Sequence, residues 1–151
     1  MSKLSKVHHV GIPVSSIERS LPWYTNVLGL IDNDVKGGGD GEVISQALQV
    51  DGADVQFAFL EIGDVKVELL EYRSPRDGKT FGSANNDVGT VHVRFEVDDI
   101  DRAYRDLRVQ GVAFNAPPIR LGPENGPLAG HAFAYFRDPD GIQLELFELP
   151  D

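Results

Sequence analysis

The sequence predicts an α+β fold of two tandem βαβββ modules, whose strands form a cup-shaped half-barrel sheet with the helices outside. Two observations predict it: the chain repeats itself, and each repeat shows the same order of strand and helix patterns. Residues 9–20 align with residues 92–103 at five identical positions, and residues 65–72 align with residues 142–149. The expected organisation is a single domain over residues 1–151, with module one at about 5–75 and module two at about 88–150.

The composition narrows the function classes before any motif is considered. The chain has 151 residues, 41% hydrophobic and 25% charged, as in ordinary globular proteins. No hydrophobic run approaches the length of a membrane span, and a formal charge of −10 opposes binding to nucleic acid or anionic lipid. The absence of cysteine excludes disulfides and thiolate sites and fits a reducing compartment. We therefore expect a cytoplasmic protein with a small-molecule substrate and without nucleic-acid or membrane partners.

Module one begins with an alternating strand at residues 7–14. Ser15 and Glu18 have the spacing of a capping box, which predicts the start of a helix. Pro22 predicts a kink in that helix or a late start, and Gly29 suits the left-handed position after it. The segments expected next are a glycine-rich mobile loop or lid at 37–41, strands at about 43–49, 55–61 and 65–72, and a turn at Gly63-Asp64.

Module two repeats this order. Its first strand is expected at residues 91–97, and Asp98 with Asp101 predicts the start of a helix that ends at Gly111. The prolines at 117 and 118 interrupt or edge the next strand, because proline cannot donate to a ladder. The remaining elements are strands at about 131–137 and 142–148, joined by a turn at 138–141.

Four residues at repeated positions form a candidate metal site. His9 and His92 hold the same place in the two first strands, and Glu68 and Glu145 hold the same place in the two last strands. Apolar neighbours face the helix, so strand alternation puts both histidines on the opposite, concave side. Two imidazoles and two carboxylates suit one Zn, Ni, Co, Mn or Fe(II) ion, whereas Ca and Mg prefer oxygen ligands alone. Each residue taken alone is better explained as structural, but the symmetric register of all four favours the metal site.

Other residues near these positions receive a different interpretation. His8 is the competing ligand beside His9, but its parity points it toward the helix side. Glu71 and Glu148 also repeat, yet they have the opposite parity to the candidate ligands, and we interpret them as rim or surface charges. His131 begins the strand that pairs with the one carrying the last glutamate. It is either an acid–base group behind the ligands or a strand-end surface residue.

Charged residues could also line the cavity. Arg94 and Glu96 share the parity of the second candidate histidine, and they either line the cavity or pair with neighbouring residues. Arg73, Arg76 and Lys79 follow the last strand of module one. They could meet an anionic substrate, although solvated loop charges are the better explanation.

Several motifs carry a resemblance to a known family. They are His9-Val-Gly-Ile-Pro-Val14, Leu28-Gly-Leu30, Val67-Glu-Leu-Leu-Glu-Tyr72, and Asp138-Pro-Asp-Gly141 before Leu144-Glu-Leu146. With the tandem modules, they resemble the vicinal oxygen chelate superfamily of glyoxalases, fosfomycin-resistance enzymes, methylmalonyl-CoA epimerases and extradiol dioxygenases. The resemblance implies a cup that binds one divalent metal and chelates vicinal substrate oxygens. The family's ligand positions fall on His9, Glu68, His92 and Glu145.

The carboxylate of Glu68 bears on the reaction class. Glyoxalase I and methylmalonyl-CoA epimerase have a carboxylate or carboxamide at this position, whereas the dioxygenases and fosfomycin enzymes normally have no ligand there. The resemblance thus implies an epimerase, isomerase or lyase that transfers a proton through a metal-stabilised enolate, with Glu68 or Glu145 as the base. Pro13 and Tyr72 stand where bacterial glyoxalase I tends to carry glutathione-binding residues, which argues against a glutathione substrate.

Two other function classes stay open. An Fe(II) extradiol-type ring-cleavage dioxygenase would use two histidines and one glutamate. A non-catalytic binding or resistance protein of the same fold would sequester a small molecule, but such members typically lack the ligand set. Members of the family commonly pair, so we expect a homodimer in which modules join within one chain or between chains.

Overall fold

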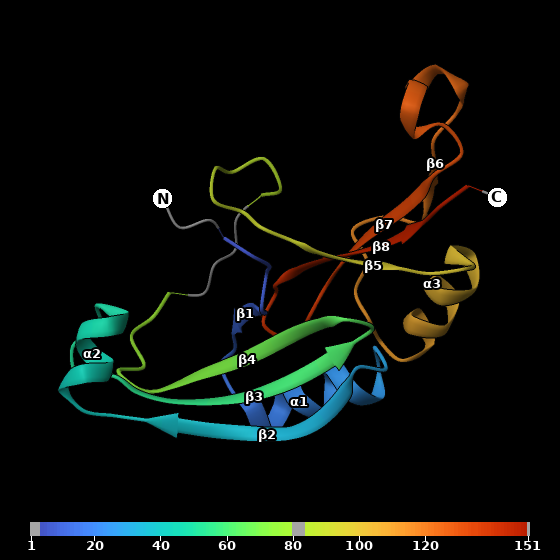
Figure 1. Ribbon diagram of the computed structural model, residues 1–151. Coiled ribbons are helices and arrows are strands. Elements are labelled where there is room, and N and C mark those ends of the chain that lie inside the picture. Colours follow the sequence, from blue (N-terminus) through green and yellow to red (C-terminus); the bar gives the residue numbers. More distant parts are fainter. Residues whose placement is uncertain (1–3, 80–83, 151) are drawn as a thin grey trace. The chain divides into compact units, whose positions relative to one another are not determined.

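The computed structural model describes residues 4–79 and 84–150, and the chain forms two compact units at residues 1–79 and 80–151 (Figure 1). Each unit contains one four-stranded sheet and a helix that contacts it. The predicted α+β class and the two βαβββ modules are thereby confirmed. Among the described residues, no helix is long and apolar enough to cross a membrane.

The first unit places its first strand beside its last. Its elements are β1 (Val10–Pro13), α1 (Ile17–Asn26), β2 (Ile31–Gly39), α2 (Glu42–Leu48), β3 (Asp54–Ile62) and β4 (Val65–Ser74). The strand order is β1-β4-β3-β2, in which β1 runs parallel to β4 and the other pairs are antiparallel. The register pairs Glu68 of β4 with Gly11 on one side and with Phe59 on the other. Glu68 therefore lies in the interior of the sheet.

The second unit repeats this topology. Its elements are β5 (Val93–Glu96), α3 (Ile100–Val109), β6 (Ile119–Arg120), the 3₁₀ helix η1 (Pro123–Leu128), β7 (Ala132–Arg137) and β8 (Gln143–Glu148). The strand order is β5-β8-β7-β6, with β5 parallel to β8. Here Glu145 of β8 pairs with Arg94 on one side and with Tyr135 on the other.

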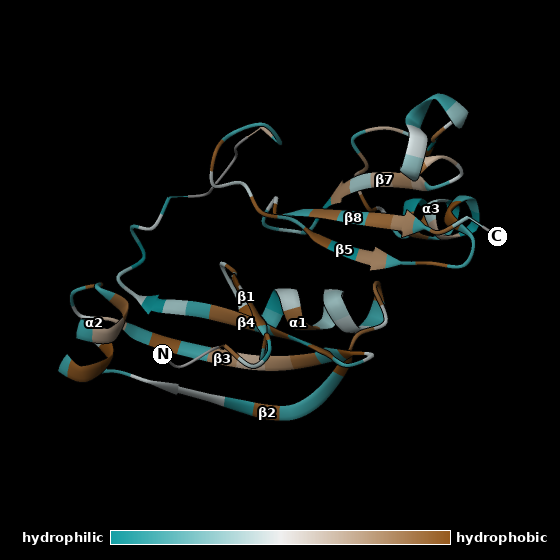
Figure 2. Ribbon diagram, turned by 45° about the horizontal axis from the view of Figure 1, so that its top comes forward, coloured by the Kyte–Doolittle hydropathy of each residue, from teal (hydrophilic) through white to brown (hydrophobic). Residues whose placement is uncertain are grey.

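The hydrophobic core of each unit lies between its helix and one face of its sheet. Tyr24 of α1 and Ile100 of α3 are fully buried, and Figure 2 shows hydrophobic residues along the central strands. Glu68 alternates with the buried Val67 and Leu69 along β4, so it points to the face away from that core. The same alternation holds for Glu145 between Leu144 and Leu146. Because residues alternate between the two faces of each strand, Glu68 and Glu145 lie on the face opposite the core.

Both main helices begin one residue later than the sequence predicts. The N-cap of α1 is Ser16, not Ser15, and its hydroxyl accepts a hydrogen bond from the Arg19 amide at 3.3 Å. The N-cap of α3 is Asp99, not Asp98. In each case two adjacent residues can cap a helix, and the sequence alone does not decide between them. Of the two outcomes expected from Pro22, a kink or a late start, the late start does not occur, because α1 begins at Ile17 and runs through the proline.

The segment between α1 and β3 differs most from the prediction. Residues 37–39, expected in a loop or lid, belong to β2, and residues 43–49, expected as a strand, form most of α2. A Cβ atom at Gly38 would lie closer than 3.0 Å to the Val55 carbonyl oxygen, so the glycines permit β2 to approach β3 closely. The helix α2 is supported by a 3.0 Å hydrogen bond from Gln46 to Glu42 one turn earlier.

Candidate metal centre

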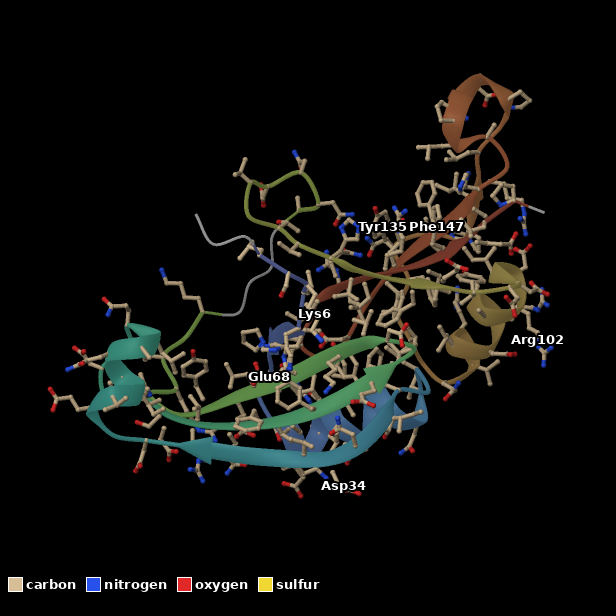
Figure 3. The ribbon with its side chains drawn as sticks, in the orientation of Figure 1. Lys6, Asp34, Glu68, Arg102, Tyr135 and Phe147 are labelled. Atoms are coloured by element: carbon tan, nitrogen blue, oxygen red, sulfur yellow. The ribbon has the colours of Figure 1, made fainter. Side chains whose placement is uncertain are left out.

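His9 and Glu68 form the first donor pair. His9 directly precedes β1, and its Nε2 atom lies 3.3 Å from Oε2 of Glu68, which is labelled in Figure 3. Phe59 packs edge-on against the His9 imidazole, with ring centroids 5.3 Å apart. The other ring nitrogen of His9, Nδ1, lies 2.8 Å from Nδ1 of His8. His9 is therefore contacted at both ring nitrogens, an arrangement that restricts the orientation of the ring.

His92 and Glu145 form the second donor pair. His92 directly precedes β5, and its Nε2 atom lies 3.0 Å from Oε2 of Glu145. Tyr135 packs edge-on against the His92 ring, also with centroids 5.3 Å apart. Figure 3 labels Tyr135 of β7 and Phe147 of the neighbouring strand β8. The second unit thus repeats the histidine, carboxylate and aromatic ring of the first.

The spacing within each pair fits two neighbouring ligands of one ion. Metal bonds of ~2.0–2.2 Å at a right angle place the two ligand atoms about 3 Å apart. The measured separations are 3.3 Å in the first pair and 3.0 Å in the second. Imidazole nitrogen with carboxylate oxygen is also a donor set that Zn, Ni, Co, Mn and Fe(II) accept. The residues present therefore fit a divalent transition metal.

The carboxylates of the two pairs differ in their surroundings. Glu145 is 1% exposed and accepts two hydrogen bonds from Arg94, at 2.8 Å from Nε and 3.1 Å from Nη2. The Glu68 side chain is 18% exposed, and the residue at the place of Arg94 in the first unit is Gly11. A Cβ atom added to Gly11 would lie 3.5 Å from Oε2 of Glu68. Only the second pair therefore carries an arginine.

Tyr135 differs from its first-unit counterpart Phe59 by a hydroxyl group. Burial raises the pKa of Tyr135, and the negative charge of Glu145 raises it further. The phenol is thus protonated around neutral pH and can donate a hydrogen bond.

The structure joins the four predicted ligands in two pairs, one in each unit. Across residues 4–79 and 84–150, it shows no cluster of three or more histidine, aspartate or glutamate side chains that could hold a metal. His131 lies just before β7, and its Nδ1 atom is 3.0 Å from the Leu128 carbonyl oxygen. The centroid of its ring lies 5.1 Å from that of the Phe147 ring.

Glu71 and Glu148 have a different role from the one that the sequence suggested. The interpretation of these residues as rim or surface charges is wrong, because each accepts a hydrogen bond from the first amide of a helix. Glu71 binds the Ile17 amide at 2.9 Å, and Glu148 binds the Ile100 amide at 2.7 Å. They lie on the core-facing side of β4 and β8, where they fix the N-termini of α1 and α3.

Two of the three cations expected beyond the last strand of module one are engaged in ion pairs. Arg73 lies within β4 and not beyond it, and it pairs with Asp54; Arg76 pairs with Glu71 at 3.0 Å. The alternation of residues along β5 predicts that Arg94 shares a face with His92. Its contact with Glu145 could not be predicted in this way, because it depends on the pairing of β5 with β8, two strands that are distant in the sequence.

Comparisons with known proteins agree with this architecture. The model of the Glyoxalase/Bleomycin resistance protein/Dioxygenase superfamily matches residues 6–146. The chain is 34% identical over 148 residues to a 2-epi-5-epi-valiolone epimerase of Actinomyces sp., covering 95% of this chain and 79% of that protein. It is 27% identical to the human mitochondrial methylmalonyl-CoA epimerase, covering 95% and 73% of the two chains.

The solved structures show the same fold. A glyoxalase family protein from Bacillus cereus superposes with a TM-score of 0.80 at 22% identity, covering 99% of this chain and 97% of that one. A glyoxylase/bleomycin resistance protein/dioxygenase domain from Frankia sp. EAN1pec gives 0.65 at 27% identity, covering 97% and 98%. The repeated topology and the match over residues 6–146 lead to one conclusion: the chain belongs to the Glyoxalase/Bleomycin resistance protein/Dioxygenase superfamily.

Proposed function

We propose that this protein is a divalent-metal-dependent epimerase that acts on a small molecule with a carbonyl group beside the reacting carbon. One observation carries the proposal: each unit presents a histidine–glutamate pair with the spacing of neighbouring metal ligands. Two relatives that match most of this chain are named as epimerases, which supports this reaction class.

His9, Glu68, His92 and Glu145 are the proposed ligands of one ion. Four ligands leave open positions on a six-coordinate ion for two vicinal substrate oxygens. When bound, the ion would supply Lewis-acid stabilisation of negative charge on the carbonyl oxygen. Two carboxylates also balance the charge of a divalent ion, so the ligand set requires no further anion.

Glu68 is the proposed base. Its side chain is partly exposed and contacts His9, whereas both Glu145 oxygens accept hydrogen bonds from Arg94. The two hydrogen bonds from Arg94 hold the Glu145 carboxylate in one orientation and leave the other lone pairs of its oxygens for the ion. A proton acceptor must instead reach the substrate carbon with a free lone pair. Glu145 is therefore assigned to holding the ion, and Glu68 to the proton transfer.

The proposed reaction conserves every atom of the substrate. Glu68 takes the proton from the carbon next to the carbonyl, and the electron pair of that C–H bond moves to the carbonyl oxygen. The carbon becomes planar. A proton delivered to its opposite face from solvent restores the carbonyl and inverts the configuration, while the proton on Glu68 passes to solvent, with no oxidant or reductant involved. Because the delivered proton comes from solvent, turnover in D₂O should place deuterium on the substrate.

The reaction is tested with the substrates of the two named relatives, 2-epi-5-epi-valiolone and methylmalonyl-CoA. Metal-loaded protein is incubated with each compound in D₂O, and deuterium at the carbon next to the carbonyl is followed by NMR. We expect incorporation and epimerisation of one of them. No exchange with either compound would contradict the proposal, and oxygen uptake by Fe(II)-loaded protein would point to the dioxygenase reaction instead.

A further inference from the structure

The bidentate contact between Arg94 and Glu145 is the largest difference between the two donor pairs. It has no counterpart in the first unit, where Gly11 occupies the equivalent position. Arg94 lies on the face of β5 opposite the buried Phe95, which is the face that carries the donors. Its guanidinium also lies 4.0 Å from the centre of the Phe147 ring. Arg94 is thus held by two independent contacts, an ion pair and a cation–π contact.

Arg94 remains accessible in this position. Its side chain is 46% exposed, whereas Glu145 beneath it is 1% exposed. A guanidinium has five N–H donors, and the contact with Glu145 engages two nitrogens. The exposed part can therefore bind another acceptor without breaking the contact with Glu145.

The charge of the proposed donor set favours an anionic acceptor. Two neutral histidines and two glutamates are balanced by a divalent ion, so Arg94 then adds one uncompensated positive charge beside Glu145. A neutral ligand would leave that charge unpaired, whereas an anionic ligand would compensate it.

We propose that Arg94 is a substrate-binding residue that selects ligands with a negatively charged oxygen next to the chelating group, such as a carboxylate. This inference rests on the proposed metal site, because Arg94 is a surplus charge only if Glu68 and Glu145 are neutralised by an ion. In the free protein Arg94 binds Glu145. With substrate present, its exposed donors bind the anionic oxygen.

The test compares two small vicinal-oxygen probes, oxamate, which is anionic, and hydroxyacetone, which is neutral. Calorimetry measures their affinities for Co(II)-loaded wild type, Arg94→Gln and Arg94→Lys. We expect Arg94→Gln to bind oxamate about 10–100-fold more weakly, the size of one charge-assisted hydrogen bond, with hydroxyacetone affected less than about threefold. Arg94→Lys should restore part of the oxamate affinity, because it keeps the charge but loses the planar fork.

A second readout separates substrate binding from a structural role. If Arg94 only held Glu145 in place, Arg94→Gln would bind Co(II) more weakly and would lose affinity for both probes equally. The proposal instead predicts that, at saturating Co(II), Arg94→Gln loses affinity for oxamate but not for hydroxyacetone, because only oxamate carries the charge that Arg94 binds. The matched control is Arg102→Gln, which removes an exposed arginine of the same unit that pairs with Asp106. It should leave both probes unaffected.

The outcomes distinguish this inference from the proposed function. If wild type binds Co(II) but Arg94→Gln binds oxamate as wild type does, the role of Arg94 is overturned and the metal site stands. If wild type binds no divalent ion, the proposed function fails and the inference fails with it. Equal losses for both probes would also overturn the inference. Circular dichroism of each variant verifies that it is folded.

Discussion

Glu68 and Glu145 illustrate how identical residues at repeated positions acquire different properties from their neighbours. Both glutamates pair with a histidine that directly precedes the adjacent parallel strand, yet Glu145 is also held by Arg94 and is buried. The difference arises from one position on the adjacent strand, glycine in the first unit and arginine in the second. It predicts that equivalent substitutions have unequal effects.

Glu68→Gln should abolish proton transfer while keeping an oxygen donor. We expect deuterium exchange into the substrate to fall by ~10²–10⁴-fold, the usual effect of removing a general base. Glu145→Gln should lower metal content more than Glu68→Gln does, because it also leaves Arg94 without its carboxylate. NMR exchange rates and metal analysis measure the two effects. Undiminished exchange in Glu68→Gln would refute the assignment of the base.

A matched control for this prediction lies on the neighbouring strand. Glu61 of β3 lies 3.6 Å from Lys66 and accepts a hydrogen bond from Asn33, without a histidine partner in these contacts. Glu61→Gln changes the net charge by the same amount as Glu68→Gln. Exchange should therefore proceed at the wild-type rate.

The histidines and glutamates could be predicted from the sequence, whereas their surroundings could not. Strand alternation places His9 and His92 relative to the apolar face, and this depends only on local periodicity. The contacts of Arg94 and Tyr135 with Glu145 depend on the register between strands that are distant in sequence. Glu71 and Glu148 were misinterpreted for a related reason, since the amides that they bind belong to helices and not to the adjacent strands.

At the scale of elements, Glu148 makes the N-terminus of α3 sensitive to pH. Hydrogen bonds from Arg120 and from the Ile100 amide lower the pKa of Glu148. Folding thus favours the charged carboxylate, and its contribution is complete above the unfolded value of about 4.3. The contribution is lost as the pH falls through the lower, folded pKa. We expect the urea midpoint of wild type to decrease over this acidic range.

Glu148→Gln tests this interpretation directly. It should lower stability at pH 7 by about 0.5–2 kcal/mol, the usual cost of a lost helix cap. Its urea midpoint should also depend less on pH below about 4.5 than that of wild type. An unchanged acid dependence in this variant would assign the effect to other carboxylates.

The glycines of β2 give a second prediction about elements. Gly38→Ala places a Cβ atom against the Val55 carbonyl oxygen, a contact that β2 can relieve only by moving away from β3. We expect a loss of about 1–3 kcal/mol, as for overpacked interiors. Gly39→Ala is the control, since its nearest neighbour is the flexible Ile44 side chain at 3.5 Å. Thermal unfolding compares the two, and equal stability would show that β2 does not require glycine at 38.

The misassignment of this segment has a physical cause. Glycine is usually a turn or loop signal, but here the close approach of two strands requires it. The predicted strand at 43–49 is mostly the short helix α2, in which local hydrogen bonds outweigh a weak alternating pattern. The strands β3 and β4 were predicted to within two residues at each end, and buried residues alternate over part of each strand.

At the scale of the whole molecule, the internal repeat is the strongest signal in the sequence. Two separate segments align between the modules, and the structure gives both units the same strand order. Such a repeat restricts the possible topologies more than the pattern of any one helix or strand, because both halves must adopt the same order of elements. For this reason the fold class was predictable although one strand and two helix starts were not.

Assembly into a homodimer is a further prediction at this scale. Each sheet ends in edge strands, β1 and β2 in the first unit and β5 and β6 in the second. Edge strands expose unpaired backbone groups that natural proteins tend to cover. Light scattering should give twice the chain mass of 16.5 kDa. A monomer mass that does not change with concentration would contradict this prediction.

We propose that the two donor pairs serve one metal ion, and metal stoichiometry tests this proposal most directly. Calorimetric titration with Zn(II) or Co(II) should give one ion per chain in wild type. His9→Ala and His92→Ala should each weaken that same binding event by at least about 10-fold, because each removes one ligand. Two ions per chain would show that the pairs act separately. No binding at all, or His9→Ala with unchanged affinity, would likewise contradict the account.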